Sequence, residues 1–294
     1  MPKLRRLWLF LVLVACAGPL RVGADGANGN PSVMSLDFCA DQYVLAFAAR
    51  DNILAVSDEA AGVNSFFANR AAGLPVSGGA LENVLMMKPD LVVRTWRGSM
   101  VGDAMARRLG IRTFQPPYAM TPEDNLRNLV LAAEAFGATA GASEMVAAYH
   151  ARWERLKKQP KSPLKAVYMT PSGFTAGLGT FVDDIIKLAG FDTVATDADM
   201  RGWVPLPLEK MVMDPPDVVI GSFFNEGTVH ISHWSGGRHG AYRDIIKELP
   251  VIMVPSRHLS CSGAFFVDAA EYIRAEASRL GLFGTKTGVQ EGVQ

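Results

Sequence analysis

One segment of the sequence occurs twice, and this repeat constrains the fold more than any other feature. Residues 81–93 read LENVLMMKPDLVV, and residues 208–220 read LEKMVMDPPDVVI. Each copy begins with Leu-Glu and apolar residues at helical spacing, continues through Pro-Asp, and ends in a short aliphatic run. This pattern is typical of a short helix that leads into a buried parallel strand. The two copies predict two similar lobes, each built on its own sheet, with chance recurrence as the alternative.

The composition allows two lobes and argues against a nucleic-acid partner. With 294 residues the chain is long enough for one large domain or for two lobes with separate cores. The 29 basic residues balance the 29 acidic ones, and no basic stripe or polybasic tail is present. We therefore expect no nucleic-acid partner.

The N-terminus has the pattern of an export signal. Basic residues between positions 3 and 6 precede an apolar stretch at 7–15, and small residues precede a plausible cleavage site after Ala24. We expect residues 1–24 to be a signal peptide and the mature protein to be soluble and periplasmic. Two alternatives remain open: a lipoprotein anchored through Cys16, whose preceding residues resemble a bacterial lipobox, and an uncleaved membrane anchor.

Around the repeat, the chain alternates short strands and helices. Strands are expected at 32–36, 53–57, 91–95, 111–114, 166–170, 218–220 and 251–254, and helices at 37–49, 121–136, 181–188 and 266–280. This alternation predicts an α/β fold with small, mostly parallel sheets. A long amphipathic helix lies between the two halves and predicts a rigid connector. We expect an N-terminal lobe at 25–142, a connecting helix at 143–160, a C-terminal lobe at 161–283 and a flexible tail at 284–294.

No motif of an activated nucleophile is present. The GxSxG elbow of serine hydrolases does not occur, and no local signature supports a pair of Cys39 with His258. The glycine-rich stretch 173–179, which we expect to be a loop, lacks the spacing of a dinucleotide fingerprint and the Lys of a P-loop. Its glycines predict a plain turn or a close approach of the backbone to a ligand.

Two cysteines, Cys39 and Cys261, remain after the N-terminal segment. An even pair in an oxidising compartment is compatible with a disulfide bond, and equally with two free thiols at a pocket. The sequence does not separate these alternatives.

Three of the five histidines, His230, His233 and His239, lie in a polar stretch at 225–240. Imidazole nitrogens at this spacing can ligate zinc or a metal that a ligand carries. We take His230 and His233 as candidates for contact with a ligand metal. A solvated loop that binds no metal is the simpler interpretation, because Gly-Gly-Arg within the loop does not impose a coordination geometry.

Aromatic and arginine side chains follow several of the expected strands. Ligands of open α/β sheets bind outside the carboxyl ends of the strands. There, aromatic side chains can stack on a flat organic group, and arginines can bind carboxylates or phosphates. Core packing is the alternative for each aromatic residue taken alone. The candidates for ligand binding are Trp96, Arg97, Phe174, Thr175, Trp203 and Arg257.

Taken together, these features resemble the periplasmic solute-binding proteins of the vitamin B12 and iron-siderophore ABC importers. The resemblance covers about residues 32–282. It rests on 35–42 (SLDFCADQ), the two repeat copies, 96–98 (WRG) after the first copy, 173–180 (GFTAGLGT), 201–203 (RGW), 254–257 (VPSR) and 260–263 (SCSG). It implies a class III periplasmic binding protein: two similar α/β lobes joined by one long helix, a ligand between them, and little hinge motion. It also implies that Glu82 and Glu209 dock onto arginines of the permease. The polar stretch at 225–240 departs from the family pattern and leaves the ligand open.

The resulting hypothesis is a binding component of an ABC importer and not an enzyme. Its expected ligand is a metal chelate, either an iron-siderophore, a cobalamin-type corrinoid or haem, and no cofactor of its own is expected. Its partners would be an ABC permease and ATPase complex in the inner membrane, and the protein is expected to be a monomer. The alternatives are a periplasmic metal-dependent enzyme that uses His230, His233 and His239, and a binding protein for a bare metal ion.

Overall fold

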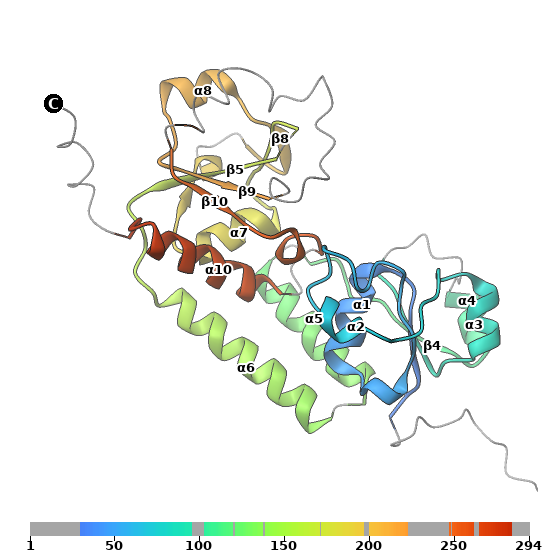
Figure 1. The fold of residues 1–294 in the computed structure, drawn as a ribbon. Helices are drawn as coiled ribbons and strands as arrows, with labels where there is room; N and C mark the ends of the chain where they lie inside the picture. Colours follow the sequence, from blue (N-terminus) through green and yellow to red (C-terminus); the bar gives the residue numbers. More distant parts are fainter. Residues whose placement is uncertain are drawn as a thin grey trace, which may run out of the picture.

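The chain forms two lobes, and one long helix, α6 (Ala140–Lys157), runs along both of them (Figure 1). The computed structural model describes residues 30–95, 103–119, 121–137, 139–170, 172–196, 200–222, 247, 249–261 and 265–283. The predicted signal peptide and C-terminal tail therefore lie outside the described residues. None of the described helices is both long and apolar enough to cross a membrane.

The N-terminal lobe is built on a sheet of four parallel strands in the order β2-β1-β3-β4. The strands are β1 (Val33–Ser35), β2 (Ile53–Ala55), β3 (Leu91–Val93) and β4 (Arg112–Phe114). The helices are α1 (Phe38–Phe47), η1 (Arg50–Asn52), α2 (Ala68–Ala71), α3 (Leu81–Met87), α4 (Asp103–Arg108) and α5 (Pro122–Ala135). Helix α5 starts where the sequence predicts, because Thr121 and Asp124 form a reciprocal capping box and Pro122 occupies the first turn.

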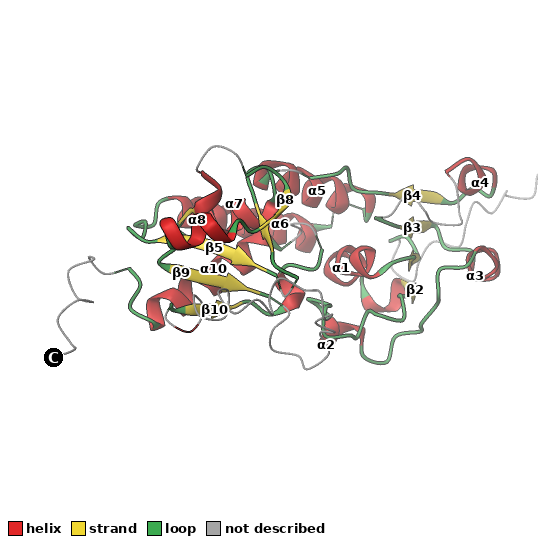
Figure 2. Ribbon diagram, turned by 90° about the horizontal axis from the view of Figure 1, so that it is seen from above, coloured by secondary structure: helices red, strands yellow, loops and turns green. Residues whose placement is uncertain are grey.

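The C-terminal lobe is built on a second sheet of four parallel strands in the order β10-β9-β5-β7. These are β5 (Lys165–Met169), β7 (Asp192–Thr193), β9 (Val218–Gly221) and β10 (Val251–Met253). The helices are α7 (Phe181–Leu188), η2 (Val194–Thr196), α8 (Leu208–Met213), η4 (Ser256–His258) and α10 (Phe266–Arg279). Figure 2 shows the two sheets as separate layers at opposite ends of the molecule.

The two sheets share one topology. When the parallel strands of each lobe are numbered from the start of that lobe, both sheets read 2-1-3-4. The third strand of each sheet, β3 or β9, is the strand of the sequence repeat, and the helix before it, α3 or α8, is the helix of the repeat. The prediction of two similar lobes with separate sheets is therefore confirmed, and chance recurrence of the repeat is not the explanation.

The Pro-Asp pair of the repeat has the same structural role in both lobes. The carboxylate of Asp90 accepts hydrogen bonds from the backbone nitrogen of Ser32 (2.9 Å) and from its hydroxyl (2.7 Å), just before β1. In the C-terminal lobe Asp217 accepts a hydrogen bond from the backbone nitrogen of Lys165 (2.7 Å), at the start of β5. Each Asp thus fixes the third strand beside the first, where a backbone N–H would otherwise lack a partner.

Helix α6 packs against both lobes. Its buried residues Ala142, Tyr149, Trp153 and Leu156 belong to one continuous hydrophobic core that includes residues of both sheets. On the C-terminal side, Arg152 forms salt bridges with Asp268 (2.6 Å) and Glu271 (2.5 Å) of α10, and the Tyr149 hydroxyl donates to Asp268 (2.8 Å). The helix begins at Ala140 and not at 143, because Thr139 accepts a hydrogen bond from the backbone nitrogen of Ala142.

One expectation about the C-terminal lobe is wrong. The stretch 173–179 does not form only a loop: Phe174–Ala176 (β6) pairs with Trp203–Pro205 (β8) as a two-stranded antiparallel ribbon. Aromatic and β-branched residues favour strands, and this preference outweighs the glycines around them. Gly177 permits the close approach of the two segments, because a Cβ at this position would lie 2.4 Å from the carbonyl oxygen of Met200.

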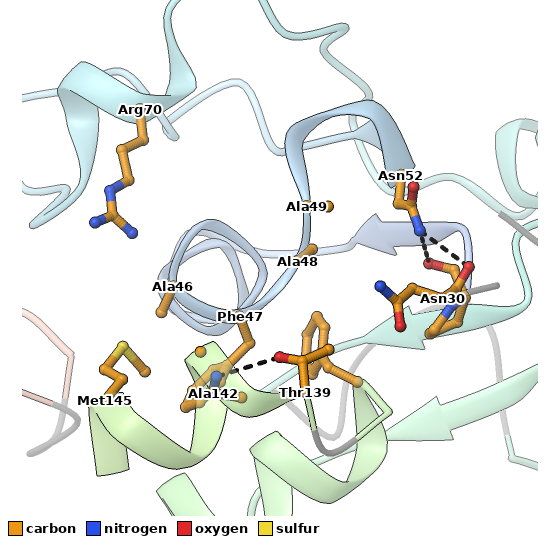
Figure 3. Close-up of a pocket in the computed structure, with 13 residues that line it drawn as sticks. Asn30, Ala46, Phe47, Ala48, Ala49, Asn52, Arg70, Thr139, Ala142 and Met145 are labelled. Carbon is orange, nitrogen blue, oxygen red and sulfur yellow. Dashed lines mark hydrogen bonds between the residues drawn. The ribbon is translucent and has the colours of Figure 1, made fainter. Parts of the chain in front are cut away.

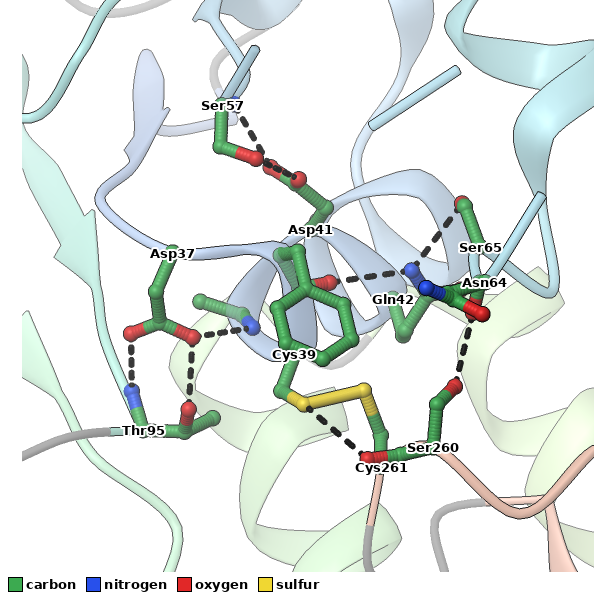
Figure 4. The surroundings of a disulfide bond; sticks show 12 residues. Asp37, Cys39, Asp41, Gln42, Ser57, Asn64, Ser65, Thr95, Ser260 and Cys261 are labelled. Atoms are coloured by element: carbon green, nitrogen blue, oxygen red, sulfur yellow. Dashed lines mark hydrogen bonds between the residues drawn. A yellow bond between two sulfur atoms is a disulfide. The ribbon is translucent and has the colours of Figure 1, made fainter. Parts of the chain in front are cut away.

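The N-terminal end of α1, together with its N-cap residue, carries four side chains that bind neighbouring segments (Figure 4). Asp37 caps α1 by accepting from the backbone nitrogen of Ala40, and it also accepts hydrogen bonds from the backbone nitrogen and the hydroxyl of Thr95 beyond β3. Asp41 accepts from the backbone nitrogen of Ser57 (2.9 Å) and from its hydroxyl (2.5 Å), beyond β2. The side chain of Gln42 donates to the Ser65 hydroxyl and accepts from the backbone nitrogen of Phe67. The fourth of these side chains is that of Cys39.

Cys39 and Cys261 form a disulfide bond, with their Cα atoms 5.4 Å apart. This result selects between the two alternatives that the sequence leaves open. The bond joins α1 of the N-terminal lobe to the segment that follows η4 in the C-terminal lobe (Figure 4). Next to it the hydroxyl of Ser260 donates to the carbonyl oxygen of Asn64 (2.7 Å), and the rings of Phe66 and Phe265 stack at 4.6 Å. The two lobes are therefore fastened together beside the ends of their strands.

We predict that the disulfide bond stabilises the fold by limiting the unfolded chain. The double variant Cys39→Ser/Cys261→Ser should lose about 2–4 kcal/mol of unfolding free energy, because the bond closes a very long loop. Denaturant titrations monitored by circular dichroism would measure this loss. Addition of a reductant should destabilise the wild-type protein and leave the double variant unchanged; equal stability of the two oxidised proteins would contradict the prediction.

Candidate functional site

The carboxyl ends of parallel strands are the place where open α/β sheets bind ligands. In the C-terminal lobe, β5, β9 and β10 point these ends toward the N-terminal lobe (Figures 1 and 2). In the N-terminal lobe, the carboxyl ends of β1, β2, β3 and β4 lead into the segments that directly follow these strands. The candidate site is therefore made of two parts, one from each lobe.

The N-terminal part is a wide cavity of about 1440 Å³ that extends along the edge strand β4 to the segments that follow β3 and β4. Its described lining consists of Arg94 and Thr95 after β3, residues 115–118 after β4, the edge segment 110–113, and Arg107 of α4. Three arginines, Arg94, Arg107 and Arg112, line this cavity, and its described lining includes no carboxylate. Such a cavity attracts anionic groups, and guanidinium groups can bind carboxylates through two parallel hydrogen bonds.

None of the residues that line this cavity was predicted as a ligand residue from the sequence, and Arg94 and Tyr118 are two examples. Arg94 is buried and is the first residue after β3, where its backbone nitrogen donates to the carbonyl oxygen of Phe114 (3.1 Å). Tyr118 lies in the segment after β4 with its side chain exposed. The only sequence feature that could have indicated these two residues is their position, because each follows a buried strand. The predicted ligand residues Trp96 and Arg97 come from the same region of the sequence, but they lie outside the described residues.

The C-terminal part includes an aromatic surface on the β6–β8 ribbon. Phe174 pairs with Pro205 and Trp203 pairs with Ala176, so both aromatic side chains lie on the same face of the ribbon. The two side chains are 40% and 49% exposed, respectively, which leaves their rings open to a ligand. Trp203 is held from below by Tyr168, whose ring packs edge-on against it at 5.9 Å. Thr175 lies on the opposite face and is buried, so Phe174 and Trp203 are the predicted residues that the structure brings together.

Arg257 and His258 occupy η4, just beyond β10. Arg257 is exposed, whereas His258 packs between Phe66 of the N-terminal lobe (5.4 Å between ring centroids) and Tyr272 of α10 (5.4 Å). Burial and the neighbouring positive charge of Arg257 lower the pKa of His258 below its ordinary value, although Asp268 opposes this shift. His258 is therefore a neutral aromatic contact between the lobes at pH 7.

A second hollow lies on the opposite side of the N-terminal lobe and has a volume of about 450 Å³ (Figure 3). Its lining includes Asn30 and Pro31 before β1, Ala49 and Asn52 before β2, and Thr139 at the start of α6. These residues mark the amino ends of the strands. Asn52 uses its side-chain nitrogen to bind the carbonyl oxygen of Asn30 (2.9 Å), which fastens the chain before β1. The position of this hollow argues against a role in ligand binding.

The predicted docking residues occupy equivalent places in the two lobes. Glu82 is the second residue of α3, Glu209 is the second residue of α8, and both side chains are exposed. Figure 1 places α3 and α8 at the outer ends of different lobes. In the described part of the chain neither glutamate takes part in a salt bridge. Both carboxylates are therefore available to a partner.

The predicted histidine cluster cannot be placed. His230, His233 and His239 lie outside the described residues, together with the rest of the stretch 225–240. Within the ranges that the structure describes, no group of three or more His, Cys, Asp or Glu side chains could hold a metal ion.

Comparisons with known proteins give one family and a set of similar folds. Residues 39–227 match the family described as periplasmic binding protein. No curated protein matches the sequence. Among solved structures, the fold is similar to the vitamin B12 binding protein BtuF of Vibrio cholerae, with a TM-score of 0.61, 17% identity, and coverage of 85% of this chain and 98% of that one.

Two further solved structures have the same fold. The haem binding protein HutB of Vibrio cholerae is 19% identical, with a TM-score of 0.62 and coverage of 83% of this chain and 97% of that one. An ABC-type Fe³⁺-hydroxamate transport protein from Saccharomonospora viridis is 19% identical, with a TM-score of 0.57 and coverage of 83% and 92%. At these identities the similarity establishes the fold alone.

We predict that the contact of His258 between the lobes makes the fold sensitive to acid. Because the pKa of His258 is lower in the folded chain than its ordinary 6.5, the unfolded chain binds the proton more readily. The stability that this group contributes is present above pH 6.5 and is lost as the pH falls below it. The variant His258→Phe should therefore lose less unfolding free energy between pH 7.5 and pH 5 than the wild type, as measured by denaturant titrations at both pH values. An unchanged pH dependence in the variant would show that His258 does not contribute.

Proposed function

Because the chain belongs to the periplasmic binding protein family, we propose that it is the substrate-binding component of an ABC importer. In this proposal it captures a metal chelate in the periplasm and delivers it to a permease and ATPase complex in the inner membrane. The family consists of binding proteins and not of enzymes, so the metal-dependent enzyme considered as an alternative is set aside. We further propose that residues 1–24 are the signal peptide that directs export.

The observation that carries this proposal is the presence of two different surfaces, one on each lobe. One lobe contributes a cavity lined by Arg94, Arg107 and Arg112, and the other contributes the half-exposed rings of Phe174 and Trp203. A bulky ligand with a flat apolar face and acidic groups at its edge is complementary to both surfaces. Metal chelates of the kinds named in the three similar structures, vitamin B12, haem and ferric hydroxamates, are ligands of suitable size.

The proposed binding mode assigns a role to each part of the site. The guanidinium groups bind the acidic edge of the chelate, and the exposed aromatic faces stack on its flat part. Arg257, exposed in η4 beyond β10, is a further cation for the same edge. Thr175 stays in the proposal, and so do Trp96 and Arg97, which follow β3 in the sequence and lie outside the described residues. His230 and His233 stay as candidate ligands of a metal that the chelate carries. A bare metal ion is not favoured as the ligand, because the described residues include no cluster that could hold one.

A binding screen by tryptophan fluorescence would test the ligand class. The chain has five tryptophans, and Trp203 lies in the proposed site. Haem, cobalamin and a ferric hydroxamate siderophore should be titrated in turn, at low and at high salt. Binding that weakens as salt increases would support the role of the arginines in holding an anionic chelate. Failure of all three chelates to bind would contradict the proposal.

We predict that the aromatic surface contributes to affinity. The variants Phe174→Ala and Trp203→Ala should each weaken binding of the chelate on the order of tenfold, because each removes a stacking ring. Isothermal titration calorimetry would measure the change without relying on fluorescence. Trp153→Phe, a substitution on α6 away from the ribbon, is the matched control and should keep wild-type affinity. Wild-type affinity in both ribbon variants would exclude stacking at this surface.

We also predict that the two exposed glutamates act in transport and not in ligand binding. Charge reversal at both, Glu82→Arg/Glu209→Arg, should abolish uptake in cells and leave ligand affinity intact, since charges at the edge of an interface govern encounter and register. The control is Glu134→Arg/Asp192→Arg, which reverses one exposed acid in each lobe. Equal loss of ligand affinity in the glutamate variant would count against the docking role, and so would normal uptake.

A further inference from the structure

Two serine hydroxyl groups at the carboxyl ends of the C-terminal sheet are buried without a hydrogen bond. Ser222 directly follows β9, and Ser256 begins η4, three residues after β10. The two residues are 0% and 3% exposed, respectively. In the described part of the chain, neither Oγ atom has a hydrogen-bond partner. Such atoms are rare in native proteins because burial of an unpartnered polar group is costly, so each one needs an explanation.

The two serines lie at the same end of the sheet. The backbone nitrogen of Val254, directly after β10, donates to the carbonyl oxygen of Gly221, the last residue of β9 (2.8 Å). Ser222 follows Gly221 by one position, and Ser256 follows Val254 by two. Both serines therefore lie where β9 and β10 point toward the N-terminal lobe (Figure 1). Open α/β sheets bind their ligands at this end of the strands.

Three other hydroxyl groups just beyond strands have partners in the fold. In the N-terminal lobe, the hydroxyl groups of Ser57 and Thr95 donate to carboxylates at the N-terminal end of α1. In the C-terminal lobe, the hydroxyl group of Thr170, directly after β5, donates to the carbonyl oxygen of Phe174 (3.1 Å). These three groups hold their loops in place. The fold gives no such role to the two unpartnered serines, and alanine would serve it equally well at both positions.

We propose that the hydroxyl groups of Ser222 and Ser256 bind an oxygen-bearing arm of the ligand, either a carboxylate or an amide carbonyl. This inference rests on the proposed function, because the arm belongs to a chelate only if the chain binds one. A serine hydroxyl donates to an oxygen of either kind. Because neither side chain is exposed, the group that reaches them must be narrow and must enter between the lobes. Arg257, which is exposed next to Ser256, adds a cation that favours a carboxylate.

This role predicts opposite effects on stability and on ligand affinity. The free chain bears the cost of two buried hydroxyl groups without partners, and a ligand that supplies the partners removes this cost. Removal of the hydroxyl groups should therefore preserve or increase the stability of the free chain while it weakens ligand binding. A hydroxyl group that serves only the fold has the reverse signature, because its loss destabilises the chain without a direct effect on the ligand.

The test uses the variants Ser222→Ala, Ser256→Ala and their combination in the full mature chain. Each chelate that the wild type binds among haem, cyanocobalamin and a ferric hydroxamate siderophore is titrated by isothermal titration calorimetry. Each single variant should weaken binding about tenfold and keep or raise the midpoint of urea denaturation. The matched control is Ser162→Ala before β5, where the buried hydroxyl donates to the carbonyl oxygen of Leu282 (2.7 Å). The control should lower the midpoint and keep wild-type affinity.

The outcomes separate failure of this inference from failure of the proposed function. A greater loss of affinity for haem, which carries carboxylates, than for cyanocobalamin, which carries amides, would identify the arm as a carboxylate, and the reverse would identify an amide. Wild-type affinity of the double variant for every chelate would overturn the inference and leave the proposed function standing. If that variant also has a lower midpoint, the hydroxyl groups serve the fold by holding a buried water. If the wild type binds none of the three chelates, the proposed function itself is wrong.

Discussion

Contacts at the N-terminal end of α1 hold the loops of the N-terminal lobe in place and join this lobe to the C-terminal one. Asp37 and Asp41 accept hydrogen bonds from residues beyond β3 and β2, Gln42 binds the loop before α2, and Cys39 is bonded to the C-terminal lobe. Asp41 is fully buried, and burial raises the pKa of its carboxyl group while the hydrogen bonds from Ser57 oppose that shift. Loss of one partner would leave a buried polar group without a hydrogen bond, which destabilises a fold far more than loss of an exposed contact. Loops that surround the ligand-binding ends of the strands are therefore held by a few buried contacts.

The contact region between the lobes explains why this fold is suited to small movements. The disulfide bond, the stack of Phe66 on Phe265, and helix α6 all cross from one lobe to the other. One continuous hydrophobic core passes through this region, and packed cores do not deform gradually. Large closure of the lobes would break these contacts together, so we expect the two proposed ligand-binding surfaces, and also α3 and α8, to stay at a nearly constant separation.

Much of this architecture could be predicted from the sequence, because the repeat occurs at equivalent places in both lobes. The two-lobed α/β fold, the long connecting helix, the membership in the periplasmic binding protein family and the absence of an enzyme function are confirmed. The pairing of β6 with β8 could not be predicted, because Phe174–Ala176 and Trp203–Pro205 are separated by a helix and owe their contact to tertiary packing. The disulfide bond joins residues 222 positions apart, and spacing alone cannot reveal a contact of that range. Arg94 and Tyr118 could not be predicted as site residues, because a single residue after a strand forms no recognisable sequence motif.

The repeat contains some residue positions that the fold requires and others that the fold does not constrain. Helices α3 and α8 have 7 and 6 residues, too few to be stable in isolation, so they depend on Val84, Met211 and the buried prolines for their place on the sheet. The Pro-Asp pair recurs because each lobe needs the same hydrogen bond between its first and third strands. Neither requirement reaches the outward face, where any polar side chain would satisfy the helix and improve solubility. Glu82 and Glu209 on that face are therefore required by neither contact, and the docking role proposed for them supplies a reason for an acid at both positions.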